Sequence, residues 1–367
     1  MNIVDLPRVI FLKLKRIPRS NIKERLIIGV KKYIQNYPSY ISLQTVSACN
    51  LKCKHCFIND YRTNIHDGVI KIMKFDEFVL FVERLRPMIQ KASYFQFSTF
   101  EAILNKNLFD MMDYILTINS RMKFPFLSNT MELSSDKIKK LEKYPVSEIN
   151  ISLDGCTKKT VEDFKTEVVF DKIIETIKQL KQSALKDKVA VTFVAHKNNV
   201  HELPQYVDFV NSLGVKQIYV SNILTFTKNL TGLELYSKEG NEYAEKIFAE
   251  AVLRAKRNQQ NISMPRLKPE LIGCQACETF FVDINGNVAP CDFLAVSTPF
   301  TLWDVTVQNK PVIFGNIFKD DPVSIFRSPA FKYFRNSHRL GKNLPKECTN
   351  CIDALGLMCS NRINYTA

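Results

Sequence analysis

The feature of this 367-residue chain that most limits its fold is a sixfold alternation of strand-like and helix-like segments between residues 40 and 221. Strands that alternate with helices form parallel sheets with helical crossovers, so the pattern predicts an α/β fold. Six units are too few for a complete eightfold barrel, and they predict an open, partial (β/α)6 barrel. The predicted strands are Tyr40–Val46, Tyr94–Phe97, Phe124–Leu127, Glu148–Leu153, Val189–Ala195 and Gln217–Val220, and the predicted helices are Lys74–Leu85, Leu108–Ile118, Ser134–Leu141, Phe170–Leu180 and Leu203–Leu213.

The chain divides into four parts on this pattern. Residues 1–39 form a basic N-terminal extension, residues 40–221 the partial barrel, residues 222–270 a helical linker, and residues 271–367 a small cysteine-rich α+β domain. No apolar run approaches the roughly 20 residues that a membrane-spanning helix needs. Charged residues interrupt the N-terminus, which does not have the form of a signal peptide. The protein is therefore expected to be cytosolic.

The net charge is strongly positive, at +14. A basic surface attracts anionic substrates or an acidic protein partner, although it can also be no more than a solvated face. No nucleic-acid-binding motif accompanies the charge, so a nucleic-acid partner is not expected.

Ten cysteines are unusual in a cytosolic chain, where disulfides are disfavoured and clustered cysteines indicate metal ligation or redox chemistry. Nine of them fall into three clusters, and Cys156 stands alone. The first cluster is Cys49, Cys53 and Cys56, which follows the first predicted strand at the end where α/β folds bind ligands. Three thiolates leave one iron of a cubane cluster open, whereas a closed zinc site needs four ligands. His55 would complete a zinc site only with strain, because it lies between two of the proposed ligands.

Cys-x3-Cys-x2-Cys after a first strand resembles the signature of the radical S-adenosylmethionine (radical SAM) superfamily. The resemblance implies a [4Fe–4S] cluster on Cys49, Cys53 and Cys56, with SAM chelated to the open iron. One electron then cleaves SAM to a 5′-deoxyadenosyl radical, which takes a hydrogen atom from the substrate. The cofactors would supply the reaction, and the protein would position the substrate.

Other positions resemble the SAM-contacting segments of that superfamily. Thr99-Phe100-Glu101-Ala102 stands where the family has Gly-Gly-Glu-Pro, and only the glutamate that faces the SAM ammonium group is kept. The resemblance further implies that the ribose and carboxylate of SAM contact polar residues at the ends of the third, fourth and fifth predicted strands. Such residues also cap helices and form turns. These candidates are Ser128, Asn129, Ser152, Asp154 and, more weakly, Asn198.

Cys156 follows Asp154-Gly155 at the same strand end. A thiol beside a radical site can donate a hydrogen atom to the substrate, as some radical SAM epimerases require, so Cys156 is a candidate catalytic residue. The alternative is a buried cysteine that packs as a small apolar side chain.

The C-terminal cysteines form the other two clusters. Asn285-Gly286 predicts a hairpin that returns Cys291 towards the pair before it. The layout resembles the SPASM and twitch domains of radical SAM enzymes, which hold auxiliary iron–sulfur clusters. Six cysteines exclude two fully cysteine-ligated clusters, and they leave one four-cysteine cluster, two incompletely ligated ones, or a structural zinc ribbon. The candidate ligands are Cys274, Cys277, Cys291, Cys348, Cys351 and Cys359.

Three functions are compatible with these features. The first is a radical SAM maturase that crosslinks, epimerises or oxidises a peptide, because most SPASM-bearing relatives act on peptides. The second is a dehydrogenase or rearrangement enzyme that acts on a carbohydrate or other small molecule. The third is a non-catalytic metal-binding protein, suggested by the altered Gly-Gly-Glu-Pro segment. An acidic electron donor, such as a flavodoxin or ferredoxin, is expected to match the basic surface.

Overall fold

The computed structural model describes residues 36–56, 71–226, 230–275, 278–303, 305–358 and 363–365. Most of the basic N-terminal extension therefore lies outside the described residues. So do Cys277 and Cys359, two of the candidate ligands in the C-terminal domain.

Six parallel strands form the partial barrel that the sequence predicts. β1 pairs with β3, a single bridge between Tyr94 and Lys123 continues to β4, and β4, β5, β7 and β8 follow in order. Neighbouring strands in this order are consecutive along the barrel portion of the chain, as helical crossovers require. The strands are β1 (Tyr40–Leu43), β3 (Tyr94–Gln96), β4 (Phe124–Ser128), β5 (Val146–Ser152), β7 (Val189–Ala195) and β8 (Gln217–Asn222).

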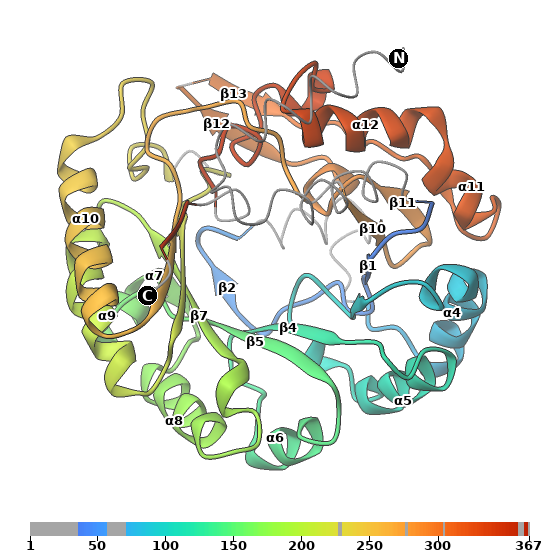
Figure 1. The fold of residues 1–367 in the computed structure, drawn as a ribbon, viewed down its shortest axis with the longest axis horizontal. Helices are drawn as coiled ribbons and strands as arrows, with labels where there is room; N and C mark the ends of the chain where they lie inside the picture. Colours follow the sequence, from blue (N-terminus) through green and yellow to red (C-terminus); the bar gives the residue numbers. More distant parts are fainter. Residues whose placement is uncertain are drawn as a thin grey trace, which may run out of the picture.

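Helices form an arc around the outside of these strands (Figure 1). Each buries one stripe of apolar residues: in α8, Ile173, Ile177 and Leu180 are buried at helical spacing. Ser134 caps α6 by accepting a hydrogen bond from the backbone N–H of Lys137, as its position before the helix predicts. The five predicted helices are confirmed, and the arc comprises α4 (Phe75–Ile89), α5 (Leu108–Ile118), α6 (Ser135–Leu141), α8 (Phe170–Lys181), α9 (Leu203–Ser212) and α10 (Glu242–Arg257).

Three further elements are not predicted by the sequence pattern. The helix α7 (Lys158–Phe164) follows β5, and the two-residue strand β6 (Lys165–Thr166) continues directly from it. β6 pairs antiparallel with β2 (Lys52–Cys53) inside the cysteine loop, which places Cys53 opposite Lys165. The cysteine loop is thus attached to the segment that follows β5.

The linker between the barrel and the C-terminal domain is not only helical. It contains α10, but also β9 (Asn261–Met264), which pairs parallel with β8 and antiparallel with β15 (Ile363–Tyr365). The apolar residues Ile262 and Met264 are buried there, so the strand extends the barrel sheet. The expectation of a helical linker over residues 222–270 is incomplete for this reason.

The C-terminal domain shares a sheet with the barrel, because β10 (Thr279–Val282) pairs parallel with β1. The predicted hairpin is confirmed: β10 and β11 (Asn287–Ala289) are antiparallel, and Gly286 has the positive φ of 84° that the turn needs. One hydrophobic core includes barrel residues and residues of this domain. The remaining elements are β12 (Pro299–Leu302), β13 (Val305–Gln308), β14 (Gly315–Asn316), α11 (Pro322–Arg327) and α12 (Pro329–Leu340).

Among the described residues, no helix is both long enough and apolar enough to cross a membrane.

Candidate active site

The first cysteine cluster lies in the loop that leaves the C-terminal end of β1. Cys49, Cys53 and Cys56 are all partly buried, and the backbone N–H of Cys56 donates to the carbonyl oxygen of Cys53 at 3.2 Å. Burial raises the pKa of the Cys53 thiol to about 12; the Lys165 ammonium opposes this, and the Cys56 and Cys49 thiols add to it. Cys53 therefore lies near enough to Cys49 and Cys56 for their charges to affect its pKa.

Three of the candidate SAM-contacting residues lie together beside Cys49. Glu101 is 3% exposed, and its carboxylate accepts hydrogen bonds from the Ser128 hydroxyl at 3.0 Å and the Asn129 backbone at 2.7 Å. The Asn129 side-chain amide donates to the Cys49 sulfur at 3.3 Å. Burial raises the pKa of Glu101 to about 7. This chain of contacts connects the ends of β3 and β4 to the cysteine loop.

The residues that replace the family's two glycines have a structural role. Phe100 packs against an apolar cluster of the C-terminal domain that includes Phe281 and Val296. Neither Thr99 nor Phe100 is among the described residues with a positive φ, so the two positions do not need the left-handed backbone that favours glycine.

The other two candidates at the end of β5 are held by a residue that the sequence analysis missed. The Lys165 ammonium lies 2.9 Å from the Asp154 carboxylate and donates to the Ser152 hydroxyl at 2.6 Å. The Lys165 and Asp154 side chains are 2% and 1% exposed. Only the pairing of β6 with β2 brings Lys165 to this place, and no residue pattern predicts a pairing between two-residue strands.

Asn198 and Cys156 lie apart from these contacts. Asn198 is exposed, and its backbone N–H donates to the His196 imidazole at 3.3 Å. The Cys156 backbone and thiol donate to the Glu202 carboxylate at 2.9 and 3.3 Å. Burial, followed by the charge of Glu202, raises the pKa of Cys156 to about 12, so its thiol keeps its hydrogen at neutral pH. The role of Cys156 as a hydrogen-atom donor remains a prediction.

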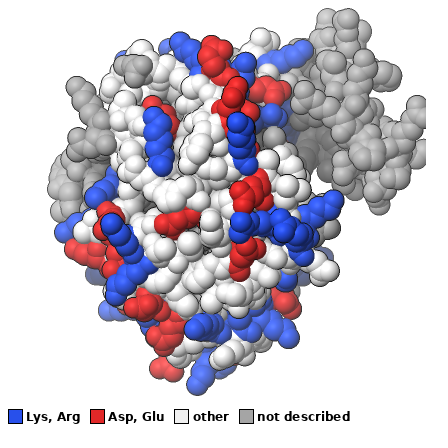
Figure 2. Space-filling view, turned by 90° about the vertical axis from the view of Figure 1, so that its left-hand side faces the viewer, with Lys and Arg blue, Asp and Glu red and all other residues white. Residues whose placement is uncertain are grey.

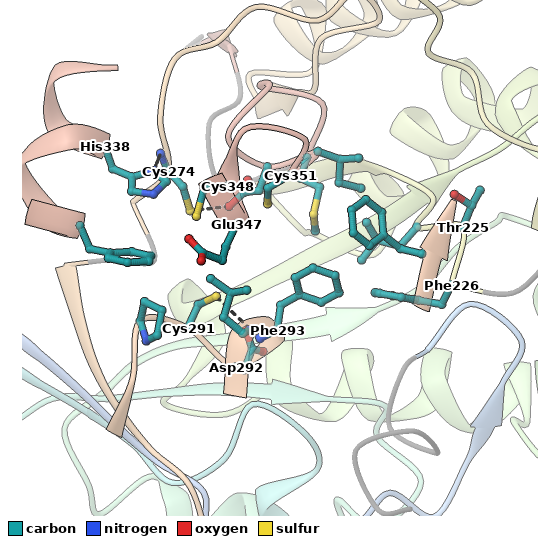
Figure 3. Close-up of a pocket in the computed structure, with 18 of the residues that line it drawn as sticks. Thr225, Phe226, Cys274, Cys291, Asp292, Phe293, His338, Glu347, Cys348 and Cys351 are labelled. Atoms are coloured by element: carbon teal, nitrogen blue, oxygen red, sulfur yellow. Dashed lines mark hydrogen bonds between the residues drawn. The ribbon is translucent and has the colours of Figure 1, made fainter. Parts of the chain in front are cut away.

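Four of the C-terminal cysteines line one cavity of about 160 Å³ (Figure 3). Cys291 follows the β10–β11 hairpin, and Cys348 ends a short turn of helix, Lys346–Cys348. The hairpin and this turn bring together residues that are far apart in the sequence. The four residues are Cys274, Cys291, Cys348 and Cys351.

The chemistry of this cavity suits a metal cluster. Burial raises the pKa of Cys351 to about 11 and raises that of Cys291 well above its ordinary value. Buried thiols are neutral without metal, and they lose their protons when iron binds. The Cys274 thiol donates to the Asp353 carboxylate at 2.7 Å, and Cys291 accepts from the Leu294 backbone at 3.4 Å.

Within the described ranges, no three His, Cys, Asp or Glu side chains converge closely enough to hold a single metal ion. A cubane cluster binds each cysteine through a different iron, so its ligands are spaced more widely than those of one ion.

The two sites are in contact through the loop after β3. Burial raises the pKa of the Asp292 carboxyl group, next to Cys291, and the Thr99 side chain, two residues before Glu101, lies close enough to lower that pKa slightly. The Thr99 hydroxyl and backbone also donate to Gln44, which follows β1, at 3.1 and 3.2 Å. A substrate between the two sites would contact residues of both domains.

Comparison with known families agrees with this arrangement. Residues 43–210 match the radical SAM superfamily, and residues 274–352 match SPASM, an iron–sulfur cluster-binding domain. The chain belongs to the radical SAM superfamily and carries a SPASM domain. Its cofactors are accordingly a [4Fe–4S] cluster with SAM, and auxiliary iron–sulfur bound by the SPASM domain.

This radical SAM protein is similar to two kinds of curated relatives. One is the tungsten-containing aldehyde ferredoxin oxidoreductase cofactor-modifying protein of Pyrococcus furiosus, 23% identical over 85% of this chain and 86% of the relative. The other is a probable GTP 3′,8-cyclase of Saccharolobus solfataricus, 25% identical over 43% of this chain, which spans 54% of the cyclase.

Its fold resembles solved radical SAM structures. Streptococcus suis SuiB bound to precursor peptide SuiA is 14% identical, covers 93% of this chain and 75% of SuiB, and has a TM-score of 0.59. anSMEcpe with bound AdoMet and the Cp18Cys peptide is 16% identical, covers 87% of this chain and 88% of anSMEcpe, and has the same TM-score of 0.59. At these identities the likeness concerns the fold alone.

Proposed function

We propose that this radical SAM enzyme is a maturase that removes a hydrogen atom from a peptide, leading to a crosslink, an epimerisation or an oxidation. Its main support is the contact between the two cysteine sites through Thr99 and Asp292. When bound, the reduced cluster and SAM supply a 5′-deoxyadenosyl radical as the hydrogen-abstracting agent. Cys274, Cys291, Cys348 and Cys351 would hold a second cluster, which would supply an electron acceptor for the substrate radical.

In this proposal Cys49, Cys53 and Cys56 ligate the SAM-binding cluster. The Glu101 carboxylate faces the SAM ammonium group, because a buried carboxylate beside Cys49 is the complementary charge. The Lys165 ammonium, opposite Cys53 in the β2–β6 pair, is proposed to bind the SAM carboxylate.

Further polar groups hold these charges in place. Ser128 and Asn129 orient Glu101, and Asp154 orients Lys165. The Ser152 hydroxyl, held by Lys165, is positioned as a partner for the ribose.

Cys274, Cys291, Cys348 and Cys351 are proposed to ligate one auxiliary cluster in the C-terminal cavity, since all four line it. Cys277 and Cys359 lie outside the described residues and stay candidate ligands. Cys156 remains a candidate hydrogen-atom donor. An acidic electron carrier is the proposed reductant, and a cytosolic location is proposed with it.

A peptide substrate is supported by the fold, which resembles that of two proteins solved with bound peptides. The second candidate is a small molecule, such as an organic cofactor precursor. It is favoured by the relative from P. furiosus, a cofactor-modifying protein that matches along 85% of this chain.

A co-expression experiment separates the two substrates. The enzyme is produced together with any short peptide encoded beside its gene, and the peptide is then analysed by mass spectrometry. The maturase proposal predicts a mass change that disappears in the Cys49→Ala variant. An unmodified peptide, together with 5′-deoxyadenosine formation that increases only with small metabolites, would assign the enzyme to the second class.

A further inference from the structure

A second cavity, of about 980 Å³, includes Lys54 of the cysteine loop in its lining, together with Asn198 and Glu202, which lie apart from the contacts of Glu101 and Lys165. Its walls come from the cysteine loop, α7, the segment after β7, and residues 230 and 233. None of Cys49, Glu101, Ser152 or Lys165 lines it. Residues that matter for its chemistry are Lys54, Lys159, Phe164, His196 and Glu202.

His196 lines the cavity with a hydrogen-bonding capacity that the described part of the chain does not use. The residue is 2% exposed, and its Nε2 has no hydrogen-bond partner among the described residues. Its Nδ1 accepts from the Asn198 backbone at 3.3 Å, and burial lowers its pKa to about 4. A neutral imidazole that accepts at Nδ1 carries its hydrogen on Nε2. The side chain therefore offers a buried N–H donor to an acceptor that enters the cavity.

Two lysine side chains line the same cavity as this donor, and a third lysine is its neighbour in the chain. Lys54 and Lys159 line the cavity, and Lys197 follows His196 in the chain and is exposed. None of the three forms an ion pair in the parts of the chain that are described. The Lys54 ammonium instead donates to the backbone carbonyl oxygen of Asp163 at 2.7 Å.

The two acidic residues of the lining are differently placed. The Glu202 carboxylate is already bonded to Thr160 and to the backbone and thiol of Cys156, so it holds two loops together. The Asp163 side chain is exposed. Apart from the exposed Asp163, the cavity thus offers a buried N–H donor at His196 and the ammonium group of Lys159, which together suit a carboxylate.

Aromatic stacking connects the cavity to the cysteine loop. The His196 ring stacks on Phe164 with centroids 4.2 Å apart, and Phe164 stacks on His55 at 5.1 Å. A group bound to His196 is therefore held at a fixed position relative to the loop of the first cluster.

We propose that this cavity anchors an acidic side chain of the peptide substrate, away from the position where hydrogen is removed. The inference rests on the proposed peptide maturase function, and it gives that function a recognition site within the described chain. A cavity of this volume suits an inserted side chain, whereas a docked electron-carrier protein needs only a charged surface.

The test measures binding of a fluorescein-labelled hexaglutamate peptide, with hexaglutamine as its uncharged counterpart, to the anaerobically reconstituted enzyme by fluorescence anisotropy. Two variants change the site: Lys159→Glu reverses an exposed charge, and His196→Phe removes the donor but keeps a ring over Phe164. The matched control is Lys143→Glu, an exposed lysine after α6.

The proposal predicts that hexaglutamate binds the wild type better than hexaglutamine does. Each site variant should weaken hexaglutamate binding roughly tenfold, the effect of losing one charge-assisted hydrogen bond, and Lys143→Glu should leave it within about twofold. Equal weakening by Lys143→Glu, or equal binding of both peptides, would show that only the overall charge matters and would overturn the site.

Two further readouts separate this inference from other outcomes. Unchanged peptide binding together with slower cluster reduction by an acidic flavodoxin in Lys159→Glu would overturn the anchor and assign the cavity to the electron donor. Formation of 5′-deoxyadenosine without substrate, measured in every variant, reports on the radical SAM activity itself. If the wild type forms no 5′-deoxyadenosine, the proposed function is contradicted. If it forms 5′-deoxyadenosine but binds hexaglutamate and hexaglutamine equally, only the proposed acidic side-chain site is contradicted.

Discussion

Glu101 and Asp154 are both buried carboxylates, yet their surroundings move their pKa values in opposite directions. For Glu101 burial dominates and raises the pKa to about 7, because the hydrogen bonds from Asn129 and Ser128 and the Lys137 charge lower it too little to compensate. For Asp154 burial acts in the same sense, but the Lys165 ammonium and His55 outweigh it, and the pKa lies below its ordinary value. Glu101 is thus the residue whose charge a cationic ligand can change.

SAM binding should therefore depend on pH through Glu101. Below about pH 7 the free enzyme holds Glu101 protonated, and a SAM ammonium group favours its ionised form, so binding releases a proton. Affinity should rise about tenfold between pH 6 and pH 8, as measured by equilibrium dialysis of the reconstituted enzyme. Glu101→Gln should bind SAM weakly with little pH dependence, and Glu132→Gln, a partly exposed neighbour, should behave as the wild type. The same pH dependence in Glu101→Gln would exclude Glu101 as its source.

Removing Lys165 should destabilise the fold as well as the site. Lys165→Met leaves the Asp154 carboxylate buried without its counter-charge. Breaking a buried pair in this way costs roughly 3–5 kcal/mol. Anaerobic urea unfolding should show this loss, and the double variant Lys165→Met with Asp154→Asn should recover part of it. A loss below about 1 kcal/mol, typical of a surface pair, would show that the pair is not effectively buried.

At the scale of elements, the long amphipathic helices and the apolar strands could be predicted from sequence because each is defined by its own periodicity. Leu108–Ile118 and Val189–Ala195 have the predicted bounds. The pairing of β2 with β6 could not be predicted, since two-residue strands have no periodicity and their contact depends on the folded barrel. The place of Lys165 in the site could not be predicted for the same reason. Glu101, Ser128 and Asn129 follow predicted strands, so they could be expected at one end of the sheet.

The turn before Cys274 offers a test of the auxiliary site. Gly273 has φ +82°, and a Cβ added there would lie 2.0 Å from the His338 carbonyl oxygen. Gly273→Ala should therefore displace Cys274. The iron content of the protein should fall by the iron of the auxiliary cluster, while the iron of the SAM-binding cluster remains. Gly232→Ala is the matched control, because Gly232 also has a positive φ, of +90°, but no atom within 4 Å of the added Cβ. In both variants, an alanine in the left-handed backbone conformation destabilises the fold by roughly 1–2 kcal/mol. Equal iron content and stability in the two variants would contradict the placement of Cys274.

At the scale of the whole molecule, the positive charge is unevenly distributed. The face that carries α9 and α10 shows acidic and basic side chains next to one another (Figure 2), including the pair of Arg254 with Asp208 at 2.7 Å. Residues 1–35 contain nine Lys or Arg and only two Asp or Glu, against a net charge of +14 for the chain. Attraction of an acidic partner should depend strongly on this segment.

Reduction of the enzyme by an acidic flavodoxin should consequently be sensitive to salt. Raising the ionic strength from about 0.01 to about 0.15 M shortens the screening length from about 30 to about 8 Å, and stopped-flow reduction rates should fall. A variant lacking residues 1–35 should start slower and depend less on salt. Rates that do not respond to salt in the full chain would contradict electrostatic steering of the donor.

The most direct test of the central claim is the formation of 5′-deoxyadenosine. The enzyme is reconstituted with iron and sulfide without oxygen, given SAM and dithionite, and its products are quantified by chromatography and mass spectrometry. The account predicts 5′-deoxyadenosine and methionine from the wild type, and neither from a variant in which Cys49, Cys53 and Cys56 are all replaced by Ala. A wild type that binds zinc in this loop, or that leaves SAM intact once its clusters are assembled, would contradict it.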